Sequence, residues 1–373
     1  MIRQFLLIFI LSVSAQYCGA MSHEAERQLV QAIGSKIVVG FHGTTVADPG
    51  VQQIIEYAHK GLIGGIVLFS YNIVSKEQLT ELLSSIQAAA TSLLLICVDQ
   101  EGGRVQRLRA RQGFTDYLSA YEVAQTLTVD QAYQYYKTLA AELKEIGITC
   151  NLGPVIDLHT SKDHPVPNPV IGGINRSFGY DTGKIVSYAE AFIKAHTEHG
   201  ILTCLKHYPG HGLANADTHK GLVDITQSHE IQERTPYVSL IKAGYKGMVM
   251  PAHLIHRSID QVYPATLSQK ILTEWLRKED RFEGVIISDD LHMGALQRDY
   301  TLDQIVLQAL TAGIDILLFS NNPSANQTEV HFKPDPQLPE KIIEIILNGL
   351  EEGLITKEAI YTSYQRLERL KAT

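Results

Sequence analysis

From residue 36 onward the sequence alternates between short apolar runs and longer segments with helical periodicity, and this alternation strongly constrains the fold. Each run has hydrophobic side chains at consecutive positions, which indicates strands that helices cover on both faces. The runs lie at 36–41, 65–69, 93–98, 149–155, 203–207, 247–251, 284–288 and 314–319. The helical patterns include 76–90, 130–147, 183–200, 235–244, 269–280, 303–312, 338–351 and 356–371. Eight β/α units over residues 36–371 predict a single (β/α)₈ barrel of the TIM type.

An open, doubly wound parallel sheet is the competing architecture. Such a sheet usually carries a glycine-rich turn of the form G-x-G-x-x-G after its first strand. Residues 40–45 read G-F-H-G-T-T, which does not match that form. No linker rich in proline, glycine or serine divides the chain, so we expect one folded domain over residues 21–373.

The first twenty residues differ in kind from the rest of the chain. Arg3 is their only charge, Phe5–Leu11 is unbroken apolar sequence, and small residues follow it. This pattern is typical of a secretory signal peptide, here with cleavage after Ala15 or Ala20. An uncleaved anchor is the alternative, but the apolar run is much shorter than the ~20 residues of a membrane-spanning helix. We therefore expect an exported protein, periplasmic or secreted, with no stable membrane span.

The charge balance argues against a nucleic-acid-binding protein, and the positions of the cysteines argue against a fold that depends on disulfides. The chain has 32 Lys and Arg against 40 Asp and Glu, a net charge of −8, and no basic stripe of the kind that binds nucleic acid. Cys97, Cys150 and Cys204 each lie inside an apolar run, so we interpret them as small buried hydrophobic residues rather than an essential disulfide. Nothing in the sequence indicates the oligomeric state.

Polar residues follow the predicted strands at the points where they end. They are His42, Asp99-Gln100-Glu101, Asp157, Lys206-His207, His253, Asp289-Asp290 and Ser320-Asn321. In a barrel all these positions lie on one face, where the active sites of this fold are built. Carboxylates and imidazoles there are costly to bury unless they pair or take part in chemistry. The pattern therefore predicts an enzyme with a polar pocket at that face.

Six short motifs carry a family resemblance that covers residues 36–320. They are V-D-Q-E-G-G-R-V-Q-R-L at 98–108, G-P-V-I-D-L at 153–158, N-R-S-F-G at 175–179, K-H-Y-P-G-H-G-L-A-N-A-D-T-H at 206–219, P-A-T-L-S at 264–268 and I-S-D-D-L-H-M-G-A at 287–295. Together they resemble the single-domain bacterial β-N-acetylhexosaminidases of glycoside hydrolase family 3. The resemblance implies a retaining exo-β-N-acetylglucosaminidase that acts on terminal GlcNAc residues of peptidoglycan fragments or related glycans and needs no cofactor or metal.

The resemblance also implies the catalytic residues. The family's nucleophile corresponds to Asp289, which would attack the anomeric carbon and form a glycosyl-enzyme. Its neighbour Asp290 points to the other side of the strand, and we interpret it as a structural hydrogen-bonding residue. The family's acid/base is the His of a D-x-H motif, here His219, with Asp217 as its partner. Because histidine titrates near neutral pH, it can both give and take the proton.

The resemblance assigns the contacts to the sugar as well. They correspond to Asp99, Arg107, Arg176, Lys206 and His207. The sequence departs from the family pattern at three positions, with Tyr208 for Phe, Thr218 for Ser and His292 for a small residue. His292 adds a titratable group beside the nucleophile, which affects the expected pH profile.

Several alternatives remain open at this stage. A related enzyme could use phosphate in place of water, because a histidine acid/base does not repel an incoming anion. An inactive wall-binding protein on the same fold is a second alternative. His207, His211 and His219 with Asp217 could instead form a metal site, although they match no fixed ligand spacing.

Other polar and aromatic residues have plain structural interpretations. We expect a structural ion pair between Glu101 and Arg104, and we expect His196 and His199 to be surface cations at a helix end. We interpret Trp275 as a packing residue.

Overall fold

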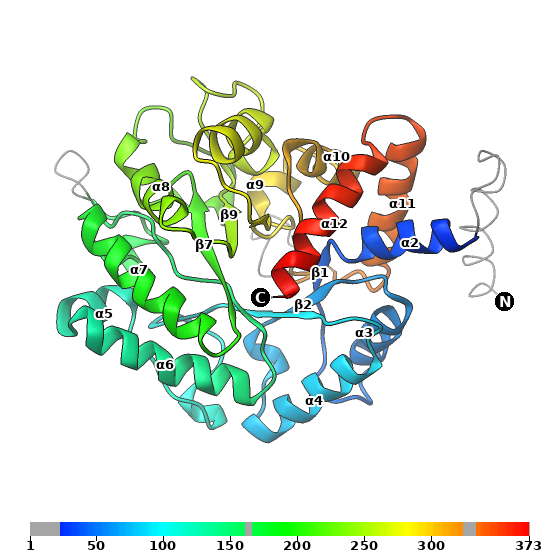
Figure 1. Cartoon of the computed structure of the whole chain (residues 1–373), viewed down its shortest axis with the longest axis horizontal. Helices are drawn as coiled ribbons and strands as arrows, with labels where there is room; N and C mark the ends of the chain where they lie inside the picture. Colours follow the sequence, from blue (N-terminus) through cyan, green and yellow to red (C-terminus); the bar gives the residue numbers. More distant parts are fainter. Residues whose placement is uncertain (1–22, 161–165, 324–332, 373) are drawn as a thin grey trace.

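The computed structural model describes residues 23–160, 166–323 and 333–372. Within them, eight parallel strands form one curled sheet with helices outside it (Figure 1). The strands, in sheet order, are β11 (Val285–Ile286), β9 (Met248–Pro251), β7 (Leu202–Tyr208), β6 (Cys150–Asn151), β3 (Leu95–Val98), β2 (Gly65–Leu68), β1 (Ile37–Gly40) and β12 (Leu317–Phe319). Each of these eight strands overlaps one of the eight predicted runs. The predicted parallel strands alternating with helices are therefore confirmed.

The strands follow one another in chain order around the sheet, and β12 lies beside β1. The order never reverses, so the sheet lacks the switch point that defines a doubly wound fold. The two end strands of the sheet also approach each other, because Ile287 and Ile316 form a parallel bridge and the Ser288 N–H donates to the Ile316 carbonyl at 2.9 Å.

Alternating side chains of the strands serve two separate cores. Val38 belongs to the cluster inside the curled sheet, whereas Ile37 and Val39 pack outward against the helices. This is the period of two that a strand imposes on its side chains. The inner cluster also contains the three predicted buried cysteines, all of which carry free thiols: Cys97, Cys150 and Cys204.

The helices cover the outer face of the sheet. They are α2 (His23–Gly34), α3 (Pro49–Lys60), α4 (Lys76–Ala89), α5 (Ala120–Thr126), α6 (Val129–Glu145), α7 (Thr182–Thr197), α8 (Thr235–Lys242), α9 (Gly294–Gln297), α10 (Leu302–Ala312), α11 (Leu338–Glu351) and α12 (Lys357–Lys371), with the π-helical segment η7 (Lys270–Glu279). Several begin at a side-chain cap; the Ser75 hydroxyl, for example, accepts the Gln78 N–H at the start of α4. The sequence patterns located α4, α6, α7, α8, η7, α10, α11 and α12 but did not identify α2, α3, α5 and α9.

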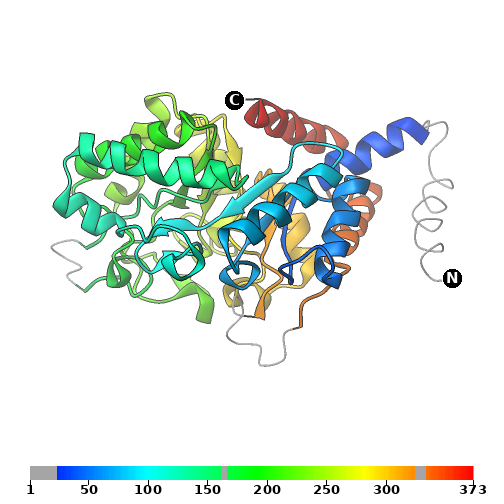
Figure 2. The same ribbon diagram turned by 90° about the horizontal axis from the view of Figure 1, so that it is seen from below.

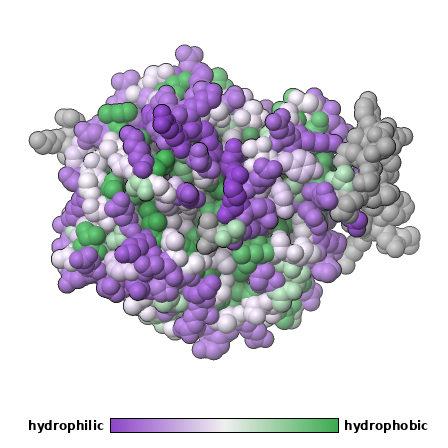
Figure 3. Space-filling model, in the orientation of Figure 1, coloured by the Kyte–Doolittle hydropathy of each residue, from purple (hydrophilic) through white to green (hydrophobic). Residues whose placement is uncertain are grey.

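One helix closes the amino-terminal ends of the strands. In α12, Leu367 and Leu370 join the cluster inside the sheet, and Arg366 pairs with Asp315 just before β12. α12 lies against α2, as both ribbon views show (Figure 2). The molecular face that carries α12 is mostly hydrophilic, with apolar side chains scattered over it (Figure 3). The opposite ends of the strands are therefore left to carry the polar residues.

His196 is not a surface cation, because its side chain is completely buried in α7 and burial lowers its pKa to about 3. Its ring stacks on Phe192 and its Nε2 contacts the Asn151 amide at 3.0 Å, so it is a neutral core residue. The predicted signal peptide at residues 1–20 lies outside the described residues. No helix in the described part of the chain is long and apolar enough to cross a membrane.

Candidate active site

Half of the eight polar residues predicted to form the site lie at or just beyond the carboxyl ends of three strands of the sheet, β3, β7 and β11. Asp99 follows β3, Lys206 and His207 lie near the end of β7, and Asp289 follows β11 after two further extended residues. Because the strands are parallel, their carboxyl ends lie along one edge of the curled sheet. Loops beyond these ends supply the other predicted residues, Arg107, Arg176, Asp217 and His219.

Three of the predicted sugar-binding residues are joined in one ionic network. The Lys206 ammonium lies 2.8 Å from Asp99 Oδ1 and 2.7 Å from Glu101 Oε1, and only 2% of its side chain is exposed. Arg107 Nη2 bonds the other oxygen of Asp99 at 2.8 Å. Burial by itself would raise the pKa of the Asp99 carboxyl, but the charges of Lys206 and Arg107 lower it well below its usual range. Asp99 is therefore a fixed anion that faces the mouth of the sheet.

Glu101 extends this network to Arg176. The Arg176 guanidinium bonds both carboxylate oxygens of Glu101, from Nε at 2.8 Å and from Nη2 at 2.9 Å. Its remaining nitrogen donates to the Val170 carbonyl at 2.9 Å. The expected pair between Glu101 and Arg104 is wrong, since Arg104 is exposed. The sequence did contain a signal for this second buried carboxylate, because Asp99 and Glu101 are two residues apart and so project to the same side of an extended segment.

Asp157 holds the segment that leads out of β7. Its buried carboxylate receives the imidazole Nδ1–H of His207 at 2.7 Å and the backbone N–H of His211 at 2.9 Å. Burial would raise the pKa of Asp157, but His207 lowers it below its usual value. His207 Nε2 then faces Arg176 Nη2 at 3.4 Å. Asp157 thus contacts a predicted sugar-binding residue and supports it from behind.

The adjacent carboxylates Asp289 and Asp290 have opposite environments. Burial would raise the pKa of Asp289, but the charges of His253, His207 and Lys206 and the N–H of Asp290 lower it below its usual value. Burial raises the pKa of Asp290. The surroundings therefore favour the ionised form of Asp289 more than that of Asp290.

The contacts of Asp290 match the structural role expected for it. Its Oδ1 accepts the backbone N–H groups of Ser320 at 2.8 Å and His292 at 3.1 Å, which ties the segment after β11 to the end of β12. Its carbonyl oxygen lies 2.9 Å from His253 Nε2, and His253 Nδ1 lies 2.8 Å from the Thr266 hydroxyl. His253 thus packs directly behind the pair of aspartates.

His219 and Asp217 form a pair on the long loop after β7. His219 Nδ1 lies 2.8 Å from Asp217 Oδ1, which also accepts the backbone N–H of His219 at 2.9 Å. An Nδ1–H bond to a carboxylate favours the tautomer whose Nε2 carries the lone pair. The His219 side chain is 41% exposed, so it is accessible to a substrate and to water.

This loop packs beside the segment that carries the aspartates. The turn η4 (Thr218–Lys220) contacts α9, which begins four residues after Asp290. Burial lowers the pKa of the His253 imidazole. The charge of Asp289 raises this pKa and the charge of His219 lowers it, so both residues act on the same ring. The fold therefore brings His219 into the neighbourhood of Asp289, although 70 residues separate them in the sequence.

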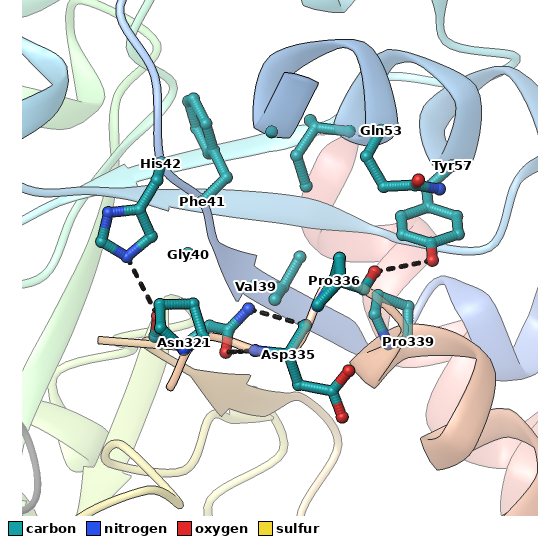
Figure 4. Close-up of a pocket in the computed structure, with 13 residues that line it drawn as sticks. Val39, Gly40, Phe41, His42, Gln53, Tyr57, Asn321, Asp335, Pro336 and Pro339 are labelled. Atoms are coloured by element: carbon teal, nitrogen blue, oxygen red, sulfur yellow. Dashed lines mark hydrogen bonds between the residues drawn. The ribbon is translucent and has the colours of Figure 1, made fainter. Parts of the chain in front are cut away.

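A pocket of about 260 Å³ lies beside the site, between β1, α3 and the start of α11 (Figure 4). Its lining residues are Val39, Gly40, Phe41, His42, Gly50, Gln53, Ile54, Tyr57, Asn321, Pro334, Asp335, Pro336 and Pro339. Asn321 exchanges two hydrogen bonds of 2.9 Å with the backbone of Asp335, and the Tyr57 hydroxyl donates to the Pro336 carbonyl at 2.8 Å. The remaining surface is mostly apolar, and none of the predicted sugar-binding residues lines it.

The pocket and the site share one wall. His42, which the sequence left as a strand-end residue, stacks on Tyr71 with 4.6 Å between ring centroids, and its Nε2 lies 3.4 Å from the Asn321 carbonyl. The Asn321 N–H donates to His292 Nδ1 at 3.2 Å. His292, one of the departures from the family pattern, thus links the segment of Asp289 to the pocket wall.

The three histidines of the metal alternative have different partners. His207 bonds Asp157, His219 bonds Asp217, and His211 Nδ1 lies 3.4 Å from the Asn168 amide. Over the described ranges no group of three or more His, Cys, Asp or Glu side chains is arranged to hold a metal ion. Trp275, predicted to be a packing residue, packs against the core with the Arg234 guanidinium over its ring at 4.5 Å.

Comparison with known proteins places this geometry in context. A family model described as the glycosyl hydrolase family 3 N-terminal domain matches residues 48–370. A beta-hexosaminidase of Histophilus somni (strain 129Pt) is 37% identical over 304 residues, which cover 78% of this chain and 83% of that protein. A beta-hexosaminidase of Nitrosomonas eutropha is 36% identical over 298 residues, which cover 78% of this chain and 81% of the relative.

Solved structures give the same relationship at lower identity. A family 3 β-N-acetylglucosaminidase from Paenibacillus sp. str. FPU-7 superposes with a TM-score of 0.81 at 27% identity, over 95% of this chain and 62% of that one. A β-N-acetylhexosaminidase from Beutenbergia cavernae superposes with a TM-score of 0.80 at 26% identity, over 95% of this chain and the whole of that one.

Proposed function

The chain belongs to glycosyl hydrolase family 3 and is a glycosidase, and from this premise we propose that it is a retaining exo-β-N-acetylglucosaminidase. It removes terminal, non-reducing β-linked N-acetylhexosamine residues by way of a covalent glycosyl-enzyme. The observation that carries the proposal is the combination of a half-buried carboxylate with a lowered pKa, Asp289, and a partly exposed His219–Asp217 pair nearby.

In the first step Asp289 attacks the anomeric carbon and the bond to the leaving oxygen breaks. A nucleophile must be ionised when substrate arrives, and the lowered pKa of Asp289 provides that state at neutral pH. His219 gives its proton to the leaving oxygen. Asp217 holds the imidazole by Nδ1 and stabilises its cation before the transfer.

In the second step His219 takes a proton from water, and the water oxygen attacks the anomeric carbon. The bond between this carbon and the Asp289 oxygen breaks, which restores the Asp289 carboxylate. The sugar leaves with its original anomeric configuration because two inversions have occurred. Asp99 accepts hydrogen bonds from the sugar hydroxyls, and Lys206, Arg107, Arg176 and His207 line the same region. Water is favoured over phosphate as the acceptor, because Asp99 and Glu101 already pair with the cations of this network.

Three finer statements belong to the same proposal. The sheet is a (β/α)₈ barrel, a view supported by the bridge between Ile287 and Ile316 and by the bonds around it. Residues 21–373 form the catalytic domain. Residues 1–20 are a signal peptide, and the exported enzyme works in the periplasm or outside the cell on peptidoglycan fragments or related glycans.

One assay tests the proposal against its rivals. The protein is incubated with an aryl β-N-acetylglucosaminide, with and without phosphate, and the first products are followed by NMR. We expect β-GlcNAc as the first anomer in both conditions. GlcNAc-1-phosphate would identify a phosphorylase, α-GlcNAc would identify an inverting enzyme, and the absence of turnover would support a non-catalytic wall-binding protein.

A further inference from the structure

Another buried carboxyl group, Glu233, lies under the loop that carries His219. Glu233 belongs to the short helix η5 (Ile231–Arg234), and its side chain has no exposed surface. Its Oε1 accepts the backbone N–H of Leu213 at 3.1 Å. Among the described residues its other oxygen, Oε2, is buried without a hydrogen-bond partner. A carboxylate in this position would leave a buried charge only partly compensated.

The backbone of the loop is fitted around this carboxyl group. At Gly210, whose φ is +134°, a Cβ would collide with the Glu233 Cβ and lie 3.0 Å from its Cδ and Oε1. At Gly212, a Cβ would collide with the Leu158 carbonyl on the other side. The loop therefore passes through a space that only glycine fits, with the Glu233 carboxyl as one wall.

The charges that face Glu233 do not favour its ionised form. Asp157, across the loop, and Glu230, on the same turn, are both acidic and both raise its pKa. Tyr237 of α8 packs nearby with a buried hydroxyl, and its own pKa is raised by burial and by the charges of Asp157 and Glu233. Arg234 is the adjacent residue, but its guanidinium pairs with acidic side chains at the end of η7.

The state of Glu233 follows from this balance. Burial raises its pKa most, the N–H groups of Leu213 and Gly212 lower it, and the net result is a pKa of about 8. The Glu233 side chain is thus mostly protonated at neutral pH. At the same pH the loop must hold His219 and Asp217 in place for catalysis.

We propose that Glu233, as a neutral carboxyl group, is a positioning residue that anchors the start of the β7–α8 loop so that its later turn presents His219 and Asp217 to the substrate. The proposal rests on the proposed function.

Three side chains anchor the backbone of this loop in sequence order. Asp157 holds it at His207 and His211, and Glu233 holds it at Leu213. Asn168 holds the next residue, because its amide donates to the Ala214 carbonyl at 2.7 Å. The catalytic pair begins three residues further on.

The first test compares Glu233→Gln with Glu233→Ala at pH 7 on aryl β-N-acetylglucosaminides with good and poor leaving groups. Glutamine copies the neutral carboxyl in size and in its acceptor oxygen, so we expect kcat within about twofold of the wild type. Alanine should lower kcat by about tenfold or more on the poor leaving group, which needs the proton from His219, and much less on the good one. Equal losses on both substrates, or equal losses in both variants, would overturn the proposal.

The second test uses pH. The ratio of Glu233→Gln activity to wild-type activity should stay near one from pH 6 to 7 and rise to about tenfold at pH 9, where about nine-tenths of the Glu233 side chains are ionised. Ionisation of His219 cancels in this ratio, because both proteins contain it. Glu274→Gln, the same change on the exposed face of η7, should give a ratio near one at every pH. A flat ratio for Glu233→Gln would overturn the proposal.

The third test does not need catalysis, so it separates a failure of this inference from a failure of the proposed function. The folded chain holds a proton on Glu233 that the unfolded chain releases above pH ~4.3. Wild-type stability should therefore fall relative to Glu233→Gln as pH rises from 4.3 to 8, and then stay level. The difference between the two thermal midpoints is measured from pH 4 to 9. A difference that does not grow over this range would overturn the inference even if the enzyme is active.

Discussion

At the scale of single residues, the surroundings of two identical carboxyl groups shift their pKa values in opposite directions. Asp289 and Asp290 are neighbours with the same side chain. One has its pKa lowered by nearby positive groups, and the other has its pKa raised by burial and bonds two backbone N–H groups. The same residue type thus supplies a candidate nucleophile and a structural tie.

Replacing Asp289 with alanine should abolish turnover, because no other described carboxylate has this combination of ionisation and position near His219. A fluorinated slow substrate should label Asp289 covalently in the wild type, and peptide mass spectrometry would locate the label. As a matched control, Asp290→Asn should still be labelled at Asp289. Labelling of Asp290 in the wild type, or full activity of Asp289→Ala, would show that the assignment is wrong.

Replacing His219 with alanine should affect substrates according to their leaving groups. General acid catalysis is typically worth roughly 10²–10⁴-fold, and a good aryl leaving group scarcely needs the proton. We therefore expect a large loss of kcat/KM on poor leaving groups and a small loss on good ones. Steady-state kinetics over a series of aryl glycosides measures the difference. A uniform loss over the series would count against His219 as the acid.

At the scale of elements, buried charges join strands that are not adjacent in the chain. Lys206 of β7 bonds Asp99 and Glu101 beyond the end of β3, and Glu101 bonds Arg176 in the loop before α7. Strand β6 lies between β3 and β7 in the sheet, so the lysine spans it. The network therefore fixes the mouth of the sheet as well as the candidate sugar contacts.

Removing the lysine should destabilise the fold strongly. Lys206→Met keeps most of the volume but leaves the buried Glu101 and the half-buried Asp99 short of a partner, and breaking a buried pair typically costs about 3–5 kcal/mol in free energy of unfolding. Lys278→Met removes an exposed lysine that pairs with Glu274, and it should change stability by less than about 1 kcal/mol. Denaturant unfolding at pH 7 measures both. Similar values for the two variants would contradict the role of Lys206.

The pH dependence of the same variant has a definite sign. The folded-state pKa values of Asp99 and Glu101 are lowered, so their pairing stabilises the fold above their unfolded values near pH 4 and is lost as pH falls through the folded values. Wild-type stability should therefore decline below pH ~4. Lys206→Met, which lacks part of this pairing, should show a shallower decline.

At the scale of the whole molecule, the two ends of the curled sheet have separate tasks. Helix α12 packs its leucines against the amino-terminal ends of the strands, and Asp315 there binds Arg277 and Arg366. The carboxyl ends carry the candidate chemistry, as expected for this architecture.

The mature protein should begin after Ala15 or Ala20 and be found outside the cytoplasm. Arg3 followed by the apolar run Phe5–Leu11 has the form of an export signal, and an enzyme at the wall would meet its glycans directly. Cell fractionation with N-terminal sequencing checks both statements. Recovery of a soluble cytoplasmic form that begins at Met1 would contradict them.

The sequence by itself determined the order and type of most elements, because hydrophobic periodicity reports which faces an element buries. It also placed Asp99, Lys206, His207 and Asp289 at strand ends, since the end of an apolar run is visible in the chain. It misplaced His196, because a helix pattern cannot tell which polar residue faces a neighbouring strand.

Only the tertiary structure decided which of these residues meet. Glu101 pairs with Arg176 rather than Arg104, Asp157 receives His207, and Glu233 lies under a loop twenty residues before it in the chain. Each of these contacts joins segments that are distant in sequence, and its strength depends on burial at the meeting point. Burial and proximity arise from the packing of the whole chain, so no local pattern could have specified which carboxyl group stays charged and which stays neutral.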